Sequence, residues 1–145
     1  MSILILRGPH AALPDVPVLG RPLCERANAV GQSLRCRAFA SVRQLVSGLR
    51  RARRERTDLL LLDVGDLAMH DAAQSRAVRD ALDGLPAPYI EVHDDASRVL
   101  EPRVQPQHAP LVTVILRNDL PRAYAMALDI ALRRLHPAPA ETLHA

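Results

Sequence analysis

The chain has 145 residues, 48% of them hydrophobic, which is enough for one domain with its own core. All 19 basic residues are arginine, because the sequence contains no lysine. This composition excludes lysine Schiff-base chemistry and a Walker-type phosphate loop. The two cysteines, Cys24 and Cys36, are spaced wrongly for a metal clip and suit a reducing compartment, so we expect a cytoplasmic protein.

The net charge of +3 raises the question of nucleic acid, but aromatic residues make up only 2% of the chain. Such a sequence offers no stacking platform for single strands, and we expect no nucleic-acid partner. The arginine-rich run over residues 50–56 falls at a predicted helix end, where cations stabilise the negative end of the helix dipole. No segment reaches the ~20 apolar residues of a membrane span. The opening MSILILRGPH is broken by Arg7 and indicates a strand, not a signal peptide.

Apolar runs alternate with helical patterns along the chain, which is typical of a parallel sheet covered on both faces. In chain order, the sequence predicts a strand over residues 2–6, a helix over 22–31, a strand over 33–40, a helix that Ser41 caps and that continues through Ala52, a strand over 57–63, a helix over 72–82, strands over 89–93 and 111–116, and a helix over 121–135.

These elements predict a flavodoxin-like α/β fold, a doubly wound five-stranded parallel sheet in the order 2-1-3-4-5. We expect a single domain over residues 1–136 and a frayed tail over residues 137–145. Ligands of such sheets bind beyond the carboxyl ends of the strands. That edge gathers a set of charged residues and histidines, namely Arg7, His10, Asp63, Asp66, His70, residues 93–95 and residues 117–119.

Several segments resemble type II 3-dehydroquinate dehydratases. The opening ILILRGPH is similar to the family's first strand and its Asn-Gly-Pro-Asn turn. Arg79-Asp80-Ala81 followed by Ile90-Glu91-Val92-His93 resembles the family's Arg-Asp-Ala helix and Ile-Glu-Val-His strand, with the same spacing. The last strand and helix, VTVIL through YAMALDIAL, are similar to the family's carboxyl-terminal unit.

The resemblance implies a lyase of the shikimate pathway that converts 3-dehydroquinate to 3-dehydroshikimate by eliminating water, without a cofactor. In that family a tyrosine removes a proton, an asparagine holds a water that stabilises the enolate, and a histidine protonates the leaving hydroxyl. By resemblance His93 is the acid and Glu91 orients it. Asp80 falls on the helix aspartate near a neighbouring subunit's site, within a homo-oligomer of trimers packed into dodecamers.

The chain departs from the family where the chemistry is done. The stretch AALPDVPVLG over residues 11–20 has neither the tyrosine nor the arginine of the family's mobile loop. Three candidate substrate-binding positions are changed: His10 and Asp63 stand where the family has asparagines, and Asp95 where it has a serine. The family's arginine-rich loop corresponds to residues 99–110, with Arg98 and Arg103 out of register.

Charge at the strand ends also disfavours the family's substrate, which carries a carboxylate. Asp63, Asp66, Asp94 and Asp95 all fall on the expected ligand edge. A like charge ~4 Å away costs about 1–4 kcal/mol at surface-like dielectric constants. We therefore interpret the chain as a catalytically degenerate dehydratase relative with a binding or assembly role, in which a small molecule is a candidate ligand.

Several alternatives stay open at this point. The first is an active dehydratase with a non-standard base. The second is a receiver-like signalling domain with Asp63 as phosphoacceptor, although such domains also need an acidic pair after strand one and a lysine after strand five. The third is a metal site formed by Asp63, His70 and His93. Finally, Glu91 and His93 fit a purely structural pair as well as a catalytic one.

Overall fold

The computed structural model describes residues 2–10 and 20–137. Its elements are, in chain order, β1 (Ser2–Arg7), α1 (Arg21–Ala29), β2 (Ser33–Ala38), α2 (Val42–Arg54), β3 (Leu59–Asp63), α3 (Ala72–Asp83), β4 (Tyr89–His93), the 3-10 turn η1 (Ala96–Arg98), α4 (Glu101–Val104), β5 (Val112–Ile115) and α5 (Leu120–Leu135). All neighbouring strands are parallel, in the order β2-β1-β3-β4-β5. The predicted fold class and strand order are confirmed.

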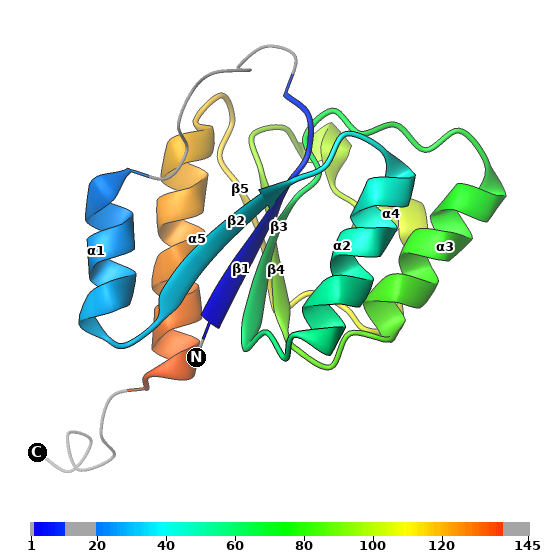
Figure 1. The fold of residues 1–145 in the computed structure, drawn as a ribbon. Helices are drawn as coiled ribbons and strands as arrows, with labels where there is room; N and C mark the ends of the chain where they lie inside the picture. The colour runs from blue at the N-terminus through cyan, green and yellow to red at the C-terminus, as the bar shows by residue number, and fades with distance from the viewer. Residues whose placement is uncertain (1, 11–19, 138–145) are drawn as a thin grey trace, which may run out of the picture.

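Helices cover both faces of the sheet, with α2, α3 and α4 on one side and α1 and α5 on the other (Figure 1). Successive side chains of a strand point to opposite faces, so β3 contributes to two cores. Leu60 and Leu62 pack on the α2–α3 side, whereas Leu59 and Leu61 pack on the α5 side. Every residue of β3 is buried, as the uninterrupted leucine run predicts for a central parallel strand.

Helix α2 shows why the predicted helices form where they do. Ser41 accepts a hydrogen bond from the Gln44 backbone N–H through its hydroxyl at 3.2 Å, as expected for an N-cap. Val42, Leu45, Val46, Leu49 and Ala52 recur at helical spacing and are buried against the sheet.

The sequence-based boundaries are wrong by one to two residues at several ends. The strand expected from residue 57 begins at Leu59, because the Thr57 N–H bonds to the Ala52 carbonyl (3.3 Å) and closes the end of α2. The first helix covers Arg21–Ala29 instead of residues 22–31, and the second strand ends at Ala38 instead of residue 40. The last strand is Val112–Ile115, shorter than the expected 111–116.

Helix α4 has no counterpart among the predicted elements. It has only four residues and begins at a proline-containing turn, too short for a helical period to register. Two other expectations, the loop over residues 11–20 and the tail over 137–145, lie almost entirely outside the described residues. Within the described ranges, no helix is both long and apolar enough to cross a bilayer.

Candidate functional site at the strand ends

The turns after β1 and β3 are joined by backbone hydrogen bonds, and this junction builds one side of the site. The Gly8 N–H donates to the Asp63 carbonyl at 2.6 Å, and the Asp66 N–H donates to the Pro9 carbonyl at 2.7 Å. A Cβ at Gly8 would collide with the Val64 carbonyl, so the approach requires glycine. The junction brings the side chain of residue 10 beside the end of β3.

Asp63 is the centre of a buried cluster. Its Oδ2 accepts a hydrogen bond from the Tyr124 hydroxyl at 2.6 Å and lies 2.7 Å from His10 Nε2, while its Oδ1 accepts the Gly65 N–H at 3.0 Å. Asp63 is 1% exposed and Tyr124 is 0% exposed. Burial, followed by the negative charge of Asp63, raises the pKa of Tyr124 well above its usual value. Tyr124 is therefore held as a neutral donor to the carboxylate.

Glu91 and His93 form a second buried pair, as the two-residue period of a strand predicts. His93 Nε2 lies 2.9 Å from Glu91 Oε1. The same carboxylate accepts the Leu100 N–H at 2.8 Å and the Glu101 N–H at 3.2 Å. Glu91 thus satisfies the free N–H groups at the start of α4, where a negative charge is favourable. The expected Glu91–His93 contact is confirmed, and the helix cap is an additional task.

The chain has two tyrosines, and the one besides Tyr124 is Tyr89. It is 1% exposed and donates its hydroxyl proton to the His108 carbonyl at 2.8 Å. Burial raises the pKa of Tyr89 far above its usual value, and the charges of Glu91, Glu101 and Asp83 add to the rise. Both tyrosines are therefore protonated donors facing inward.

The arginines near the family's substrate-gripping loop are engaged within the protein. Arg103 donates to three backbone carbonyls, those of Arg98 (2.7 Å), Leu67 (3.1 Å) and Val99 (3.3 Å). Burial lowers the pKa of Arg103, although Glu91 nearby opposes the shift. Arg98 forms an ion pair with Asp66 and lies 3.9 Å from Asp95. These two arginines therefore bind groups of their own segment and of the turn after β3.

An open hollow of about 370 Å³ lies at the ends of β4 and β5. It is lined by Asp94, Asp95, Ala96, Ile115, Arg117 and Asn118. Hydrogen bonds from the Ser97 backbone N–H and hydroxyl, each 2.9 Å, lower the pKa of Asp95. The hollow is lined by two carboxylates and one guanidinium, so its walls carry mixed charge.

The structure brings the predicted site residues together in two groups. His10 with Asp63 lies on the α5 face of the sheet, and Glu91 with His93 lies on the α4 face. Asp80 belongs to neither group: it is exposed near the end of α3, and this helix runs from the carboxyl edge of the sheet towards the opposite edge. Among the described residues no three metal-binding side chains converge, so Asp63, His70 and His93 form no such group.

Comparison with known proteins agrees with the resemblance. The chain is 33% identical over 114 residues to a 3-dehydroquinate dehydratase of Thioalkalivibrio sulfidiphilus (strain HL-EbGR7), covering 76% of this chain and 73% of that relative. The chain belongs to the type II 3-dehydroquinate dehydratase family. No family model matches the sequence.

Two solved structures share the dehydratase fold. A 3-dehydroquinate dehydratase-like protein from Bifidobacterium longum superposes with a TM-score of 0.69 at 19% identity, covering 92% of this chain and 97% of that one. A type II dehydroquinase from Butyrivibrio crossotus DSM 2876 gives a TM-score of 0.60 at 18% identity, covering 90% and 96%. At these identities the likeness concerns the fold.

Within this dehydratase relative, sequence reasoning missed the functions of Tyr124 and Arg103. Tyr124 lies 61 positions from its carboxylate partner, and no local pattern signals such a contact. Arg103 is out of register with the family's loop, and no sequence pattern indicates the direction of its side chain.

The buried Asp63 carboxylate, with both oxygens accepting hydrogen bonds, differs from the accessible carboxylate that the phosphoacceptor of a receiver-like domain requires.

Proposed function

We propose that this member of the dehydratase family does not dehydrate 3-dehydroquinate and serves instead as a binding or assembly protein on the dehydratase fold. The state of the two tyrosines carries this proposal. A tyrosine base needs a lowered pKa near the working pH. Burial raises the pKa of both Tyr89 and Tyr124, and each hydroxyl donates inward.

The acid side of the reaction is also compromised. A general acid must come within hydrogen-bond reach of the leaving group. His93 is only 3% exposed, and its carboxylate partner is shared with the start of α4. Glu91 and His93 therefore serve the attachment of α4 to the sheet in this proposal.

The open hollow at the strand ends fits the family's substrate poorly. Asp94 and Asp95 both line it, opposed by the single guanidinium of Arg117. Two carboxylates near a bound carboxylate repel it by about 1–4 kcal/mol each at ~4 Å in a surface-like dielectric. Arg98 and Arg103, which could offset that repulsion, already bind other groups.

Turnover of 3-dehydroquinate tests the proposal directly. The purified protein is mixed with 3-dehydroquinate, and the ultraviolet absorbance of the conjugated enone product is followed. Loss of the base alone removes at least ~10²-fold of rate, and the family's loop arginine and enolate-stabilising asparagine are missing as well, so we expect no product formation that depends on His93. A His93→Asn variant, checked for fold by circular dichroism, reveals any contaminating host enzyme. Product formation by the wild type that disappears in the folded variant would refute the proposal.

One observation favours a second candidate, an active dehydratase with His10 as base. The His10 imidazole is held by a buried carboxylate, an arrangement that orients catalytic histidines elsewhere. In that case His10→Asn would abolish turnover while Tyr124→Phe would leave measurable activity. If the wild-type protein shows no turnover, the two variants have no activity to compare and the first proposal stands.

The assembly part of the proposal is a homo-oligomer larger than a dimer, in line with the trimers and dodecamers that the family resemblance implies. Exposed apolar side chains on β5 and α5 and in the segment before β5 support it, namely Leu111, Ile115 and Met126. Sedimentation velocity at micromolar concentration tests it: a trimer or higher species is expected, and a clean monomer would contradict it.

A further inference from the structure

Three arginines share a single carboxylate at the β2 edge of the sheet. Arg35 and Arg37 are two residues apart on β2, so both side chains point to the same face, and Arg51 reaches that face from α2. Each of them forms an ion pair with Glu55, and the distances are 3.4 Å, 2.8 Å and 2.8 Å in chain order. Hydrogen bonds from Arg51 and then Arg37 lower the pKa of Glu55, so its carboxylate stays ionised. The cluster of three guanidiniums and one carboxylate therefore has two positive charges in excess.

Several N–H donors of this cluster are unused. Arg37 Nη2 donates to both oxygens of Glu55, at 3.0 and 2.8 Å, whereas its Nη1 is buried and has no hydrogen-bond partner within residues 2–10 and 20–137. Arg51 donates to Glu55 through Nε alone, and its side chain is 58% exposed. Its two Nη groups have no acceptor in the described part of the chain. Buried N–H groups are nearly always paired in proteins, so these donors require an acceptor that the described residues do not supply.

A hollow of about 240 Å³ opens beside Arg37 and Arg51. Gln44 and Ser47 are its other polar residues, and no carboxylate is among the described residues that line it. Gln44 Oε1 accepts the Ala40 N–H at 2.7 Å, which leaves the Gln44 Nε2 free to donate. The apolar part of the wall comes from β1, from α2 and from the end of β2, namely Leu6, Ala38, Phe39 and Gly48. The volume lies below the ~300 Å³ of the smallest drug-sized sites, so the hollow admits only a small ligand.

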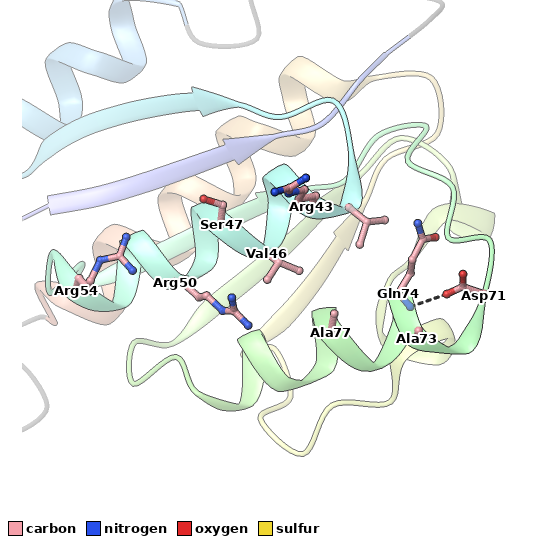
Figure 2. A pocket seen from close by; sticks show the side chains of 10 residues that line it. Arg43, Val46, Ser47, Arg50, Arg54, Asp71, Ala73, Gln74 and Ala77 are labelled. Carbon is pink, nitrogen blue, oxygen red and sulfur yellow. Dashed lines mark hydrogen bonds between the residues drawn. The ribbon is translucent and has the colours of Figure 1, made fainter.

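The hollow lies on the side of α2 that faces away from α3. Figure 2, which looks into the neighbouring space between these two helices, shows Val46 and Arg50 directed towards α3 and Ser47 directed away from it. Among the described residues, none of α3 lines the hollow, and this includes Asp80, which by resemblance lies at the contact with a neighbouring subunit. The strand-end clusters contribute no described residue to it either. The hollow is therefore separate from the expected subunit contact and from the strand-end site.

We propose that this hollow binds the phosphate group of a small phosphorylated molecule. A phosphate monoester carries about −1.5 to −2 charges near pH 7, which matches the excess positive charge of the arginine cluster. Its terminal oxygens accept hydrogen bonds from the forked donors of guanidinium groups, which recognise phosphate in this way. Leu6 and Phe39 then contact the carbon part of the ligand. The inference goes beyond the proposed function and does not depend on whether the dehydration reaction occurs.

A carboxylate is a weaker match for the same hollow. It has a single charge and two oxygens, so it leaves part of the excess positive charge uncompensated. The wall offers donors from four polar side chains, those of Arg37, Gln44, Ser47 and Arg51. Phosphate has more acceptor oxygens than a carboxylate and can engage more of these donors at once.

Isothermal titration calorimetry on the full chain tests the proposal with glycerol 3-phosphate as the probe. The titrations are made in a chloride buffer, with acetate and glycerol as control ligands. We expect saturable binding of glycerol 3-phosphate that weakens as salt rises. Acetate should bind at least about tenfold more weakly, because it makes fewer charge-assisted hydrogen bonds. Glycerol should show no saturable binding.

Variants of exposed positions on α2 locate the binding site. Arg51→Gln should weaken binding of glycerol 3-phosphate at least about fivefold, because one of the two lining guanidiniums is lost. The matched control is Arg50→Gln, which removes the same charge one position away, on the α3 side of the helix, and should leave affinity unchanged. Ser47→Phe changes no charge but should also weaken binding, because the aromatic ring occupies the hollow. Circular dichroism of each variant confirms that an altered affinity reports the site and not unfolding.

Any of four results would overturn the proposal. These are absent saturable binding of glycerol 3-phosphate, equally tight binding of acetate, equal losses in Arg51→Gln and Arg50→Gln, or full affinity in Ser47→Phe. A further variant, Arg117→Gln, removes the guanidinium of the strand-end hollow. It should bind glycerol 3-phosphate like the wild type, and a loss of affinity confined to Arg117→Gln would place the bound phosphate at the strand ends instead.

Discussion

Two carboxylate–imidazole pairs lie at the same edge of the sheet but on opposite faces. On the α5 face, the Tyr124 hydroxyl donates a hydrogen bond to Asp63, which also contacts His10. On the other face, backbone N–H groups at the start of α4 donate to Glu91, which also contacts His93. Both carboxylates are 1% exposed. The pairs have the same chemistry but obtain their stabilisation from different donors.

The difference lies in the range of the contacts. Glu91 accepts from backbone N–H groups nine and ten residues away, so it ties one short helix to its own strand. Asp63 accepts from side chains 53 and 61 residues away, so it ties a turn and a helix to the central strand. Under the proposed function, both pairs serve to hold the fold.

The largest effect is expected from Glu91→Ala. The substitution leaves two N–H groups and the His93 ring without their buried acceptor, and each buried polar group left unsatisfied costs about 1–3 kcal/mol. Urea denaturation measures the change in the free energy of unfolding. Glu101→Ala is the control, since Glu101 is exposed and contributes its backbone N–H, which the substitution keeps. Equal losses for the two variants would show that Glu91 does not cap α4.

An intermediate effect is expected from removing the Tyr124 hydroxyl. Tyr124→Phe deletes a hydrogen bond to an ionised carboxylate and should cost about 1.5–3 kcal/mol. Tyr89→Phe deletes a bond to a neutral carbonyl and should cost about 0.5–1.5 kcal/mol. Thermal and urea unfolding of the two variants side by side gives the comparison. A larger loss of stability in Tyr89→Phe than in Tyr124→Phe would mean that the Tyr124 hydroxyl does not donate to a charged Asp63 carboxylate.

The smallest effect is expected at an exposed cap. Ser41→Ala removes the side-chain acceptor of the Gln44 N–H at the start of α2 and should cost about 1 kcal/mol. The measurement is the same urea titration used for Glu91→Ala. A cost as large as that of the buried carboxylate cap would contradict the role given to burial and charge at α4.

The sequence predicts the parts of this edge that depend on local pattern. The leucine run of β3 indicates a central strand, and the two-residue period of a strand is sufficient to place Glu91 and His93 on one face of β4. Resemblance supplies the family and the expected roles of this pair, with His93 as the acid and Glu91 as the carboxylate that orients it.

The remaining parts depend on distant contacts. Nothing near Asp63 in the sequence indicates that Tyr124 and His10 converge on it, because the contact requires the packing of α5 and the joined turns after β1 and β3. The direction of Arg103 is likewise fixed by three backbone carbonyls, of which that of Leu67 is 36 residues away in the chain. Helix α4 is too short to produce a helical pattern.

Neither tyrosine is available as a base if both hydroxyls stay protonated in the folded protein, and titration of tyrosinate absorbance tests this most directly. In the unfolded chain a tyrosine has a pKa of ~10, whereas burial raises the pKa of Tyr89 and Tyr124 in the folded protein. The folded state then holds its protons more tightly, so the stability that these tyrosines contribute is present below pH ~10 and is lost as pH rises further. We predict that tyrosinate appears only together with the loss of the circular dichroism signal. Tyrosinate that forms in the folded protein near or below neutral pH would contradict this prediction and would show that a tyrosine base is present in this family member.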